Sequence, residues 1–499
     1  MPNRNKIRLL SATFIGISSI IGSGWLFAPL LAANISGPAA IISWIIAAMV
    51  IMLLALCFSE IASVYPLRGL SAVITTISHN KYFGFPFAIA NWLGIIAVVA
   101  LEADATVQYL ASLSPNIMNI LMFNHKLTIY GDVTSICMVI VFSIINFWGV
   151  SVLTKANNII TMIKLLIPML TIIILLLTVF HSSNFTRVSD SFVPYGYGSI
   201  IKTILVAGII VSFNGFQSII AYSSEVYKPH RTIPISLFIS ISVCLLIYVA
   251  IQIVFISSLP PHYLDNGWHR LHMSAPMLNL LSALGLGYFS IIIYVGSTVT
   301  PVGTAITFTG SASRLFTAMA RKDQAPEYFD RVHPRYKVSR RSLLFNTLFA
   351  ISFILIFHSW SNLAQILSLL HIVSYLTAPI AMITLRRTIS RDKYKLYVPF
   401  GIALCYVIFI IFNYLISYAD LNIVINLAIM LIGIQIVFII SRLAIEWECI
   451  KENMISIIKI SIYIMLLPLI CFLNKVVPIL EFDIIVIFFS ILTLFILTN

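Results

Sequence analysis

The strongest constraint on the fold is a series of apolar segments that are each long enough to cross a lipid bilayer as a helix. About 20 apolar residues span the hydrocarbon core, and we count about fourteen such segments. Hydrophobic residues make up 60% of the chain and charged residues 9%, a balance that soluble domains of this size do not show. The last two segments are the weakest, so we predict an all-α polytopic membrane protein with about 12 to 14 spans. The segments cover residues 9–33, 38–63, 85–113, 132–150, 157–180, 199–223, 234–258, 287–317, 342–358, 362–385, 399–418, 421–441, 456–474 and 482–498.

The distribution of basic residues predicts the orientation of the chain. The formal net charge is +13, and most Lys and Arg residues fall in alternate loops, above all in the runs at 314–341 and 386–395. Basic loops of membrane proteins face the cytoplasm, which places the N-terminus there. The first segment has no short apolar region followed by a small-residue cleavage site, so we expect it to be retained as a span of the cytoplasmic membrane. This distribution explains the charge without a nucleic-acid partner.

The chemistry-bearing side chains do not point to an enzyme or a metalloprotein. The six cysteines lie in or near apolar segments without a CxxC pair, and we interpret them as packing residues. The sequence contains no HExxH motif and no Ser-His-Asp group that converges. The loop at 262–272 clusters three histidines with an acid, which is interpreted as a solvated surface or lid rather than a zinc site. We expect no metal, no cofactor and no enzymatic activity.

The first apolar segment is interrupted by Gly22-Ser23-Gly24. An unpaired backbone amide in a bilayer costs several kcal/mol, so an unwound turn at this depth persists only where it lines a polar cavity. The N-terminus of the second half-helix would present free N–H groups and a positive dipole end, to which a carboxylate is the obvious ligand. The alternative interpretation is a kink or a small-residue packing face.

Two acids stand in the third segment, within Asn91–Leu110. Glu102 lies about 16 Å from the end of this segment, close to the membrane midplane, where a carboxylate is costly and is by default functional. Asp104 is rotated by about 200° from Glu102, so the two cannot both face one cavity. A structural hydrogen bond to a neighbouring helix is the alternative for either acid.

Lys164 lies about two turns into the fifth segment. A buried ammonium needs carbonyl or carboxylate partners, or loses its proton. It could serve as a fixed internal cation or as a titrating group, or its long side chain could extend to the cytoplasmic interface.

The sixth segment contains a second break, where Ser212, Asn214, Gly215 and Gln217 fall mid-span. Interrupted helices at corresponding positions in two halves are typical of inverted-repeat transporters, which hold the substrate between them. We therefore predict a transport core at residues 1–388, with halves at about 1–185 and 190–388. Residues 389–499 would add about four C-terminal membrane helices.

Three ordered elements resemble the amino acid/polyamine/organocation (APC) permeases. They are FIGISSIIGSGWLFAP (14–29), AYSSEVYKPHRTIP (221–234) and GSASRLFTAMARKDQAPEYFDRVHP (310–334). The stretches at 91–109 and 374–387 are similar to permeases with two additional C-terminal helices, some of which carry acidic amino acids. The resemblance implies a five-plus-five inverted-repeat fold that transports an amino acid or related amine by alternating access.

The resemblance also implies where a substrate binds. Its carboxylate would meet Ser23 and Gly24, and its amino group would meet backbone carbonyls near Ile20 and in the second break. Lys164 matches a lysine that stands at the sodium position of sodium-coupled relatives, so no sodium dependence is expected. Gln217 departs from the Glu of many relatives, which directs attention to Glu102 and Asp104 for coupling. The residues assigned to binding are Ile20, Gly22, Ser23, Gly24, Val211, Phe213, Asn214, Gly215 and Gln217.

The predicted function is secondary active transport of amino acids, with a proton as the coupling ion. Protonation of Glu102 or Asp104, or proton release from Lys164, is the hypothetical coupling step. An amino acid exchanger is the alternative within this class, and an amino acid sensor on a transporter scaffold is the alternative outside it. The oligomeric state is left open. Arg314 and Arg321 could clamp an inner gate, and His371 and Tyr375 could reach a substrate or gate, although topogenic charge and ordinary packing also explain these residues.

Overall fold

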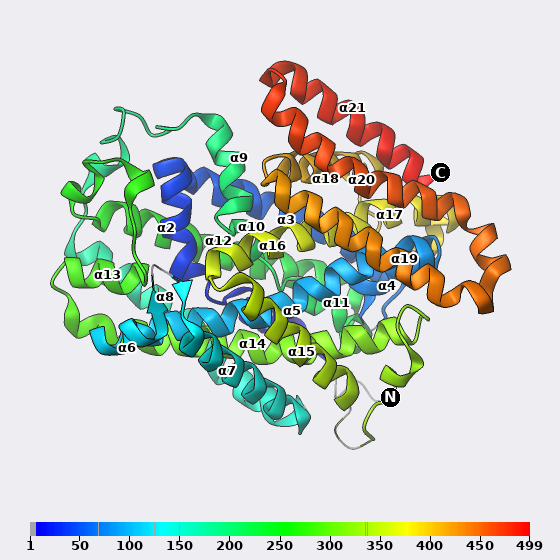
Figure 1. Ribbon diagram of the computed structural model, residues 1–499, viewed down its shortest axis with the longest axis horizontal. Helices are drawn as coiled ribbons and strands as arrows, with labels where there is room; N and C mark the ends of the chain where they lie inside the picture. The colour runs from blue at the N-terminus through cyan, green and yellow to red at the C-terminus, as the bar shows by residue number, and fades with distance from the viewer. Residues whose placement is uncertain (1–5, 68, 124–125, 149, 335, 337) are drawn as a thin grey trace.

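The structure is a computed structural model that describes residues 6–67, 69–123, 126–148, 150–334, 336 and 338–499. Helices build almost the whole of this part of the chain (Figure 1). The α-helices are α1 (Leu9–Ile20), α2 (Gly24–Ser36), α3 (Ala40–Val64), α4 (Leu70–Ser78), α5 (Lys81–Ala111), α6 (Pro115–Leu121), α7 (Ile129–Phe147), α8 (Val150–Thr178), α9 (Tyr197–Val206), α10 (Ile209–Ser212), α11 (Gln217–Ala221), α12 (Pro229–Ser258), α13 (Pro276–Ala283), α14 (Ser290–Ala320), α15 (Arg340–Phe357), α16 (Trp360–Tyr375), α17 (Thr377–Thr388), α18 (Gly401–Ser417), α19 (Leu421–Glu452), α20 (Met454–Val476) and α21 (Ile479–Thr498).

Short elements complete the connections. One antiparallel hairpin pairs β1 (Met122–Phe123) with β2 (Lys126–Leu127). The 3-10 turns are η2 (Gly37–Ala39), η3 (Ser182–Phe185), η4 (Ser223–Glu225), η5 (Pro261–Leu264), η6 (Trp268–Arg270), η7 (Gly287–Phe289), η8 (Glu327–Phe329) and η9 (Arg391–Lys393).

The helices have the length and composition of membrane spans. Within the described residues, 11 helical segments are long and apolar enough to cross a bilayer, and three shorter apolar helices accompany them: α1, α9 and α18. Every apolar segment predicted from the sequence contains at least one helix, including the two weakest at the C-terminal end. The predicted all-α polytopic fold is therefore confirmed.

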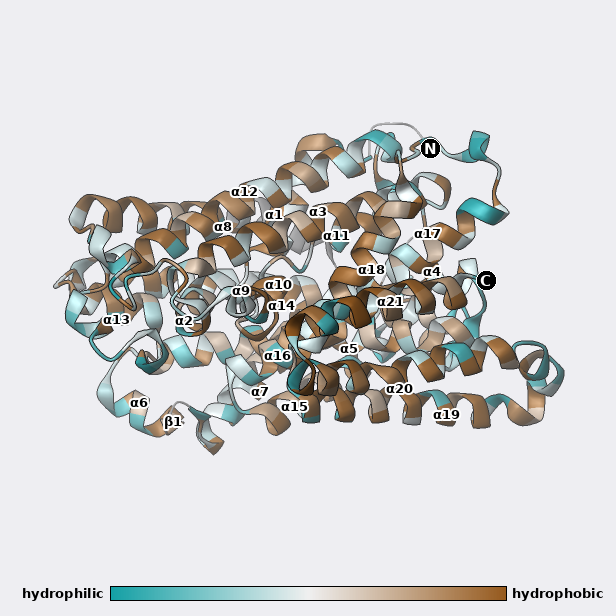
Figure 2. Ribbon diagram, turned by 90° about the horizontal axis from the view of Figure 1, so that it is seen from above, coloured by the Kyte–Doolittle hydropathy of each residue, from teal (hydrophilic) through white to brown (hydrophobic). Residues whose placement is uncertain are grey.

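Apolar side chains cover the outer helices as well as the core. Figure 2 shows hydrophobic residues along α19, α20 and α21 on faces that no other helix covers. Leu177 and Ile429 are examples of large apolar side chains that remain exposed. In water such surfaces would promote aggregation, whereas in a bilayer they face lipid tails of equal polarity.

Helix α5 is the central element of the molecule. Nearly all of its side chains are buried, and it packs against α14, α16, α4, α7, α15 and α19. A polar group on α5 is therefore deep inside the protein, whichever way it points. Helices α18 to α21 lie together at one side of the molecule (Figure 1). The division into a core at 1–388 and an addition at 389–499 remains a prediction.

Candidate substrate site at two interrupted helices

The two predicted breaks are non-helical in the structure. Residues 21–23 separate α1 from α2. In the second break Gly208 (φ 72°) separates α9 from α10, and Gly215 (φ 101°) precedes α11. These positive φ values suit glycine, because a Cβ in that region meets the backbone.

The two breaks are in direct contact. A Cβ on Gly215 would collide with the backbone of Ser19, and one on Gly24 would collide with the Ser212 hydroxyl. The Tyr248 hydroxyl of α12 lies 3.1 Å from the Ile20 carbonyl and 2.9 Å from the Ser212 carbonyl, so its one proton is shared between the breaks. Backbone groups from two segments far apart in the sequence therefore line one small region.

Glu102 meets the first break. Its carboxylate accepts a hydrogen bond from the Ser23 amide, with Oε2 at 2.9 Å and Oε1 at 3.2 Å. Ser23 precedes the first residue of α2, where backbone N–H groups lack helical partners and the helix dipole is positive. A Cβ on Gly22 would collide with this carboxylate. The helix end that the sequence predicts as a carboxylate site thus holds a carboxylate from α5.

Lys164 lies on the other side of the same break. Its ammonium donates to the Ser18 carbonyl at 2.8 Å and to the Thr304 hydroxyl at 2.6 Å, and the Thr304 hydroxyl donates to the Ile21 carbonyl at 3.1 Å. Ser18 is in the last turn of α1, where the dipole favours a cation. Lys164 is fully buried, so it does not extend to an interface. It also interacts electrostatically with Glu102 across the break.

Aromatic side chains enclose the start of α2. The Trp360 indole donates to the Ser23 hydroxyl at 2.8 Å. Phe27 stacks on Trp360 at 5.0 Å between ring centroids and meets the edge of Tyr109 at 5.2 Å. Such rings exclude water and strengthen the electrostatic interactions beside them.

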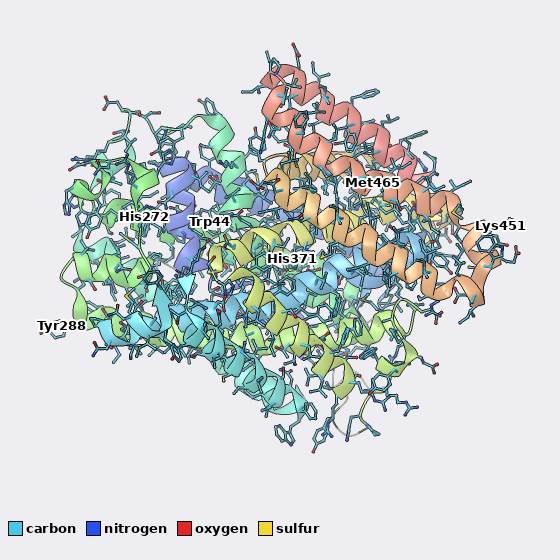
Figure 3. All side chains as sticks on the ribbon, viewed as in Figure 1. Trp44, His272, Tyr288, His371, Lys451 and Met465 are labelled. Carbon is cyan, nitrogen blue, oxygen red and sulfur yellow. The ribbon has the colours of Figure 1, made fainter. Side chains whose placement is uncertain are left out.

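A polar network organises the second break around Asn214. Its side-chain oxygen accepts from the Gly215 amide at 2.8 Å, from Tyr375 at 3.2 Å and from Gln217 at 3.3 Å. Its amide nitrogen lies 2.9 Å from His371 Nε2, and His371 Nδ1 lies 2.9 Å from the Leu367 carbonyl. We assign the histidine proton to Nδ1, because a carbonyl can only accept. Figure 3 shows His371 midway between the two ends of the molecule.

The remaining predicted residues lie as follows. Ile20, Val211 and Phe213 are buried at the breaks, and Phe213 packs on Trp44 and Tyr248 with ring centroids 5.9 Å and 5.4 Å away. Asp104 is buried on the opposite side of α5 from Glu102, facing α7. It does not join the two breaks.

The basic residues and the histidine loop lie away from these breaks or at their edge. Arg314 contacts Tyr222, which follows α11, whereas Arg321 pairs with Asp330 on the surface. His269 lies 2.6 Å from the Asn34 carbonyl and stacks on Tyr195. Within the described residues, no group of three or more His, Cys, Asp or Glu is placed to hold a metal ion.

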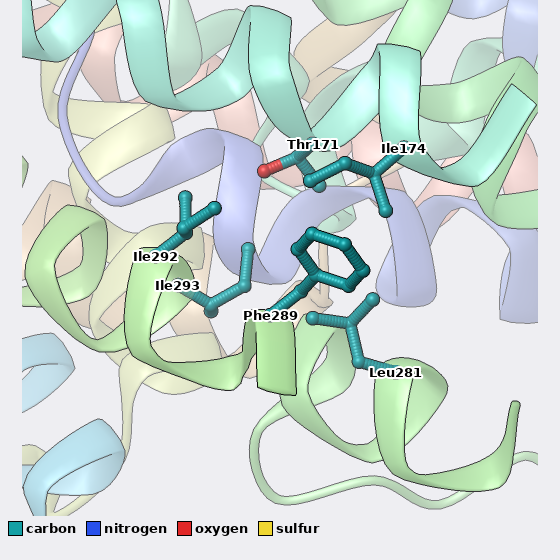
Figure 4. A pocket seen from close by; sticks show the side chains of 6 residues that line it. All are labelled: Thr171, Ile174, Leu281, Phe289, Ile292 and Ile293. Carbon is teal, nitrogen blue, oxygen red and sulfur yellow. The ribbon is translucent and has the colours of Figure 1, made fainter. Parts of the chain in front are cut away.

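An apolar pocket lies elsewhere, between α8, α13, η7 and α14 (Figure 4). Its one polar lining group, the Thr171 hydroxyl, donates to the Ile167 carbonyl of its own helix. A charged or zwitterionic ligand would find nothing there to orient it. The pocket is therefore no alternative to the interrupted helices.

Sequence reasoning did not find Trp360, Tyr248 or Thr304. Tyr248 and Thr304 stand in apolar segments and Trp360 stands between two of them, and no local pattern marks any of the three. A general rule gives the one signal for the two aromatic residues: a Trp or Tyr buried among membrane helices needs a hydrogen-bond partner for its N–H or O–H group.

An all-α membrane protein with two interrupted helices in contact around buried charges has the architecture of a secondary transporter. The sequence model of the family described as "Amino acid permease" matches residues 7–439. The chain belongs to the amino acid permease family, as its resemblance to APC permeases predicts.

Individual relatives agree with this assignment. The chain is 37% identical to the "Glutamate/serine transporter AimA" of Bacillus subtilis, over 78% of this chain and 72% of that protein. It is 30% identical to the "Aspartate-proton symporter" of the same organism, over 77% of this chain and 73% of that protein. It is 23% identical to the "Branched-chain amino acid permease BcaP", also from that organism, over 88% and 93% respectively. These relatives are transporters rather than enzymes.

Proposed function

We propose that this permease moves amino acids across the cytoplasmic membrane by proton-coupled symport, with its N-terminus in the cytoplasm. Glutamate, aspartate and serine are the first substrates to test, because two relatives carry these names. The observation that carries the proposal is the Glu102 carboxylate on the Ser23 amide. It supports a carboxylate-binding role for the start of α2.

The substrate would bind to the backbone groups that are hydrogen-bonded to Glu102 and Tyr248 in this structure. The substrate carboxylate would accept from the Ser23 and Gly24 amides at the positive end of α2. The substrate amino group would donate to the Ile20 and Ser212 carbonyls, which share the single proton of Tyr248. Both halves of the chain would then contact one ligand, so that its binding biases their relative rocking.

Protonation of Glu102 would couple the proton to the substrate. A neutral carboxyl group accepts a hydrogen bond more weakly than a carboxylate, so a proton on Glu102 would release the Ser23 amide to the substrate. Proton and substrate would then favour each other's binding, and this coupling is reciprocal. Lys164, on the far side of the break, would retain a positive charge there for the incoming carboxylate.

The experiment is uptake of labelled glutamate, aspartate and serine into proteoliposomes of the full-length chain. We expect an inward proton gradient to drive accumulation into empty vesicles. Glu102→Gln should reduce the accumulation that the gradient drives and retain exchange of labelled for unlabelled substrate, because Gln resembles the protonated acid in shape and charge. Glu327→Gln, on a surface turn, is the matched control.

The outcomes separate the alternatives. Uptake only into vesicles preloaded with amino acid would make the chain an exchanger. Binding without uptake of any amino acid would make it a sensor. If Glu102→Gln leaves gradient-driven accumulation unchanged, Glu102 has no role in the coupling step. The proposal that the protein is an amino acid permease would still stand.

A further inference from the structure

A second buried acid lies away from the interrupted helices, between α5 and α7. Asp104 is 1% exposed, and neither of its carboxylate oxygens has a hydrogen-bond partner of normal geometry. The Ser135 hydroxyl of α7 faces this carboxylate, is fully buried and also lacks such a partner. A carboxylate buried in this way is costly unless it gains a proton or a counter-ion.

The next groups along α7 connect Asp104 to the surface. Asp132 stands one helical turn from Ser135, on the same face, and one of its oxygens is buried without a partner. Its other oxygen lies 2.9 Å from Nδ1 of His358, which follows the last residue of α15. Helices α5, α7 and α15 pack against one another, so the row bridges three elements.

Exposure falls steadily along this row. The side chain of His358 is 45% exposed and that of Asp132 is 9% exposed, whereas Ser135 and Asp104 are buried. A neutral histidine, a protonated carboxyl group and a hydroxyl each carry both a donor and an acceptor. Every side chain in the row can therefore take up a proton on one side and pass one on. Within the described part of the chain, Asp132 is the one charged group that the helices packed on α5 present to Asp104, and His358 is the partner of Asp132.

We propose that Asp104 is a proton-binding site loaded through His358, Asp132 and Ser135. The predicted orientation places the end of α15 and the start of α7 outside, so the proton enters from the external solution. The proposal rests on the proposed permease function and names a proton site distinct from Glu102.

The proton moves stepwise without any other reactant. His358 takes a proton from external water and passes its Nδ1 proton to Asp132. Asp132 then donates to the Ser135 oxygen while the Ser135 hydroxyl gives its own proton to Asp104. Asp132 and Ser135 return to their starting protonation states, and His358 is left neutral with its proton on Nε2. Exchange of this proton with external water restores the Nδ1 form, and the Asp104 carboxylate becomes a neutral acid.

A proton is the ligand that these groups favour over a metal ion. Two carboxylates and one hydroxyl are fewer oxygen ligands than hard cations gather. The position also suits coupling, because α5 carries Asp104 towards α7 and Glu102 towards the first break. Neutralising Asp104 removes the cost of burying its charge at the α5–α7 contact and so changes which packing of α5 is favoured.

The test measures accumulation of labelled serine and glutamate by full-length protein in proteoliposomes with the membrane potential clamped. With an inward gradient of about one pH unit, each coupled proton sustains about tenfold accumulation, so protons on both Glu102 and Asp104 would sustain about hundredfold accumulation. Asp104→Asn should reduce this ratio to about tenfold, the share of the Glu102 proton, and retain exchange of labelled for unlabelled substrate. Asp132→Asn and His358→Gln should slow gradient-driven uptake and leave exchange unchanged.

Controls keep the outcomes distinct. Asp265→Asn removes a half-exposed acid that pairs with Arg187 at 2.8 Å, and should leave both assays unchanged. Normal accumulation by Asp104→Asn would overturn the proposal, as would loss of exchange together with accumulation in a folded variant. If Asp104→Asn does not fold, Ser135→Ala provides the test. Slowed gradient-driven uptake by this variant would support the relay, and unchanged uptake would overturn it. Wild-type protein that exchanges but never responds to pH would refute the relay and keep the permease, whereas a wild type without transport would refute the proposed function itself.

Discussion

At the scale of single residues, the contact between the two interrupted helices depends on glycine. Gly22, Gly24 and Gly215 each stand where a Cβ would collide with a group of the opposing break or of α5. Gly215 also has a φ of 101°, which L-residues rarely adopt. Backbone atoms approach each other here because no side chain separates them.

Gly215→Ala should therefore destabilise the protein by about 2–4 kcal/mol, the sum of a strained backbone and overpacking against Ser19. Gly433→Ala is the matched control, because Gly433 lies inside α19 with open space around it and the change should stabilise that helix slightly. Thermal unfolding in detergent measures both. Equal melting temperatures for the two variants would contradict the contact between the breaks.

The buried charges of Lys164 and Glu102 give a second prediction at this scale. Lys164→Met leaves the Glu102 carboxylate buried without its cation and should cost about 3–5 kcal/mol of stability. Adding Glu102→Gln should recover much of this loss, because the remaining charge is removed. A double-mutant cycle of unfolding free energies provides the measurement, and additive effects would show that the two charges do not interact.

At the scale of elements, one buried ion pair ties the C-terminal helices to the core. Arg386 of α17 binds both carboxylate oxygens of Glu60 in α3, at 2.6 Å and 2.7 Å. Both partners also bind the backbone of Val398, just before α18, and the Arg386 guanidinium lies 3.9 Å from the centroid of the Tyr397 ring. Helix α3 and the stretch from Arg386 to Val398, which are far apart in sequence, therefore meet at one charge pair.

Arg386→Met should destabilise the protein by about 3–5 kcal/mol, since Glu60 would remain fully buried without its cation. The control is Arg391→Gln, because Arg391 is exposed 4.8 Å from the centroid of the same ring and its loss should change stability by less than about 0.5 kcal/mol. Chemical denaturation in detergent compares the two. A small effect of Arg386→Met would mean that solvent reaches Glu60.

At the scale of the whole molecule, the N-terminal segment and the basic loops occupy one end. Ile7 pairs with the backbone of Glu225 and Tyr227, next to Tyr222, which Arg314 contacts. Arg4 and Arg68 are further basic residues that we predict on the cytoplasmic side, but they lie outside the described residues. The loop from η3 to α9 lies at the opposite end, beside the histidine loop.

This arrangement predicts the labelling of introduced cysteines in intact cells. In a chain whose exposed Cys137 and Cys449 are replaced by Ser, Asp190→Cys should react with a membrane-impermeant maleimide. Arg391→Cys should react only after the membrane is permeabilised. The reverse pattern would invert the predicted orientation and the direction of the proposed proton entry.

The membrane class, the membrane-spanning helices and the two breaks can be predicted from the amino-acid sequence alone. These follow from local properties, because about 20 apolar residues define a span and a glycine-rich interruption ends a helix wherever the helix packs. The sequence also predicts that Glu102 and Asp104 point in different directions, since the rotation per residue is a property of the helix.

The partners that these side chains meet depend on how the helices pack in three dimensions. Glu102 reaches Ser23, Asp104 reaches Ser135, and Lys164 turns inward to Ser18 rather than to an interface. Trp360, Tyr248 and Thr304 come to the breaks from distant segments. In a bilayer all helix faces are similarly apolar, so hydropathy does not reveal which faces pair. Side-chain packing and interhelical hydrogen bonds choose among them, and these exist only in the assembled fold.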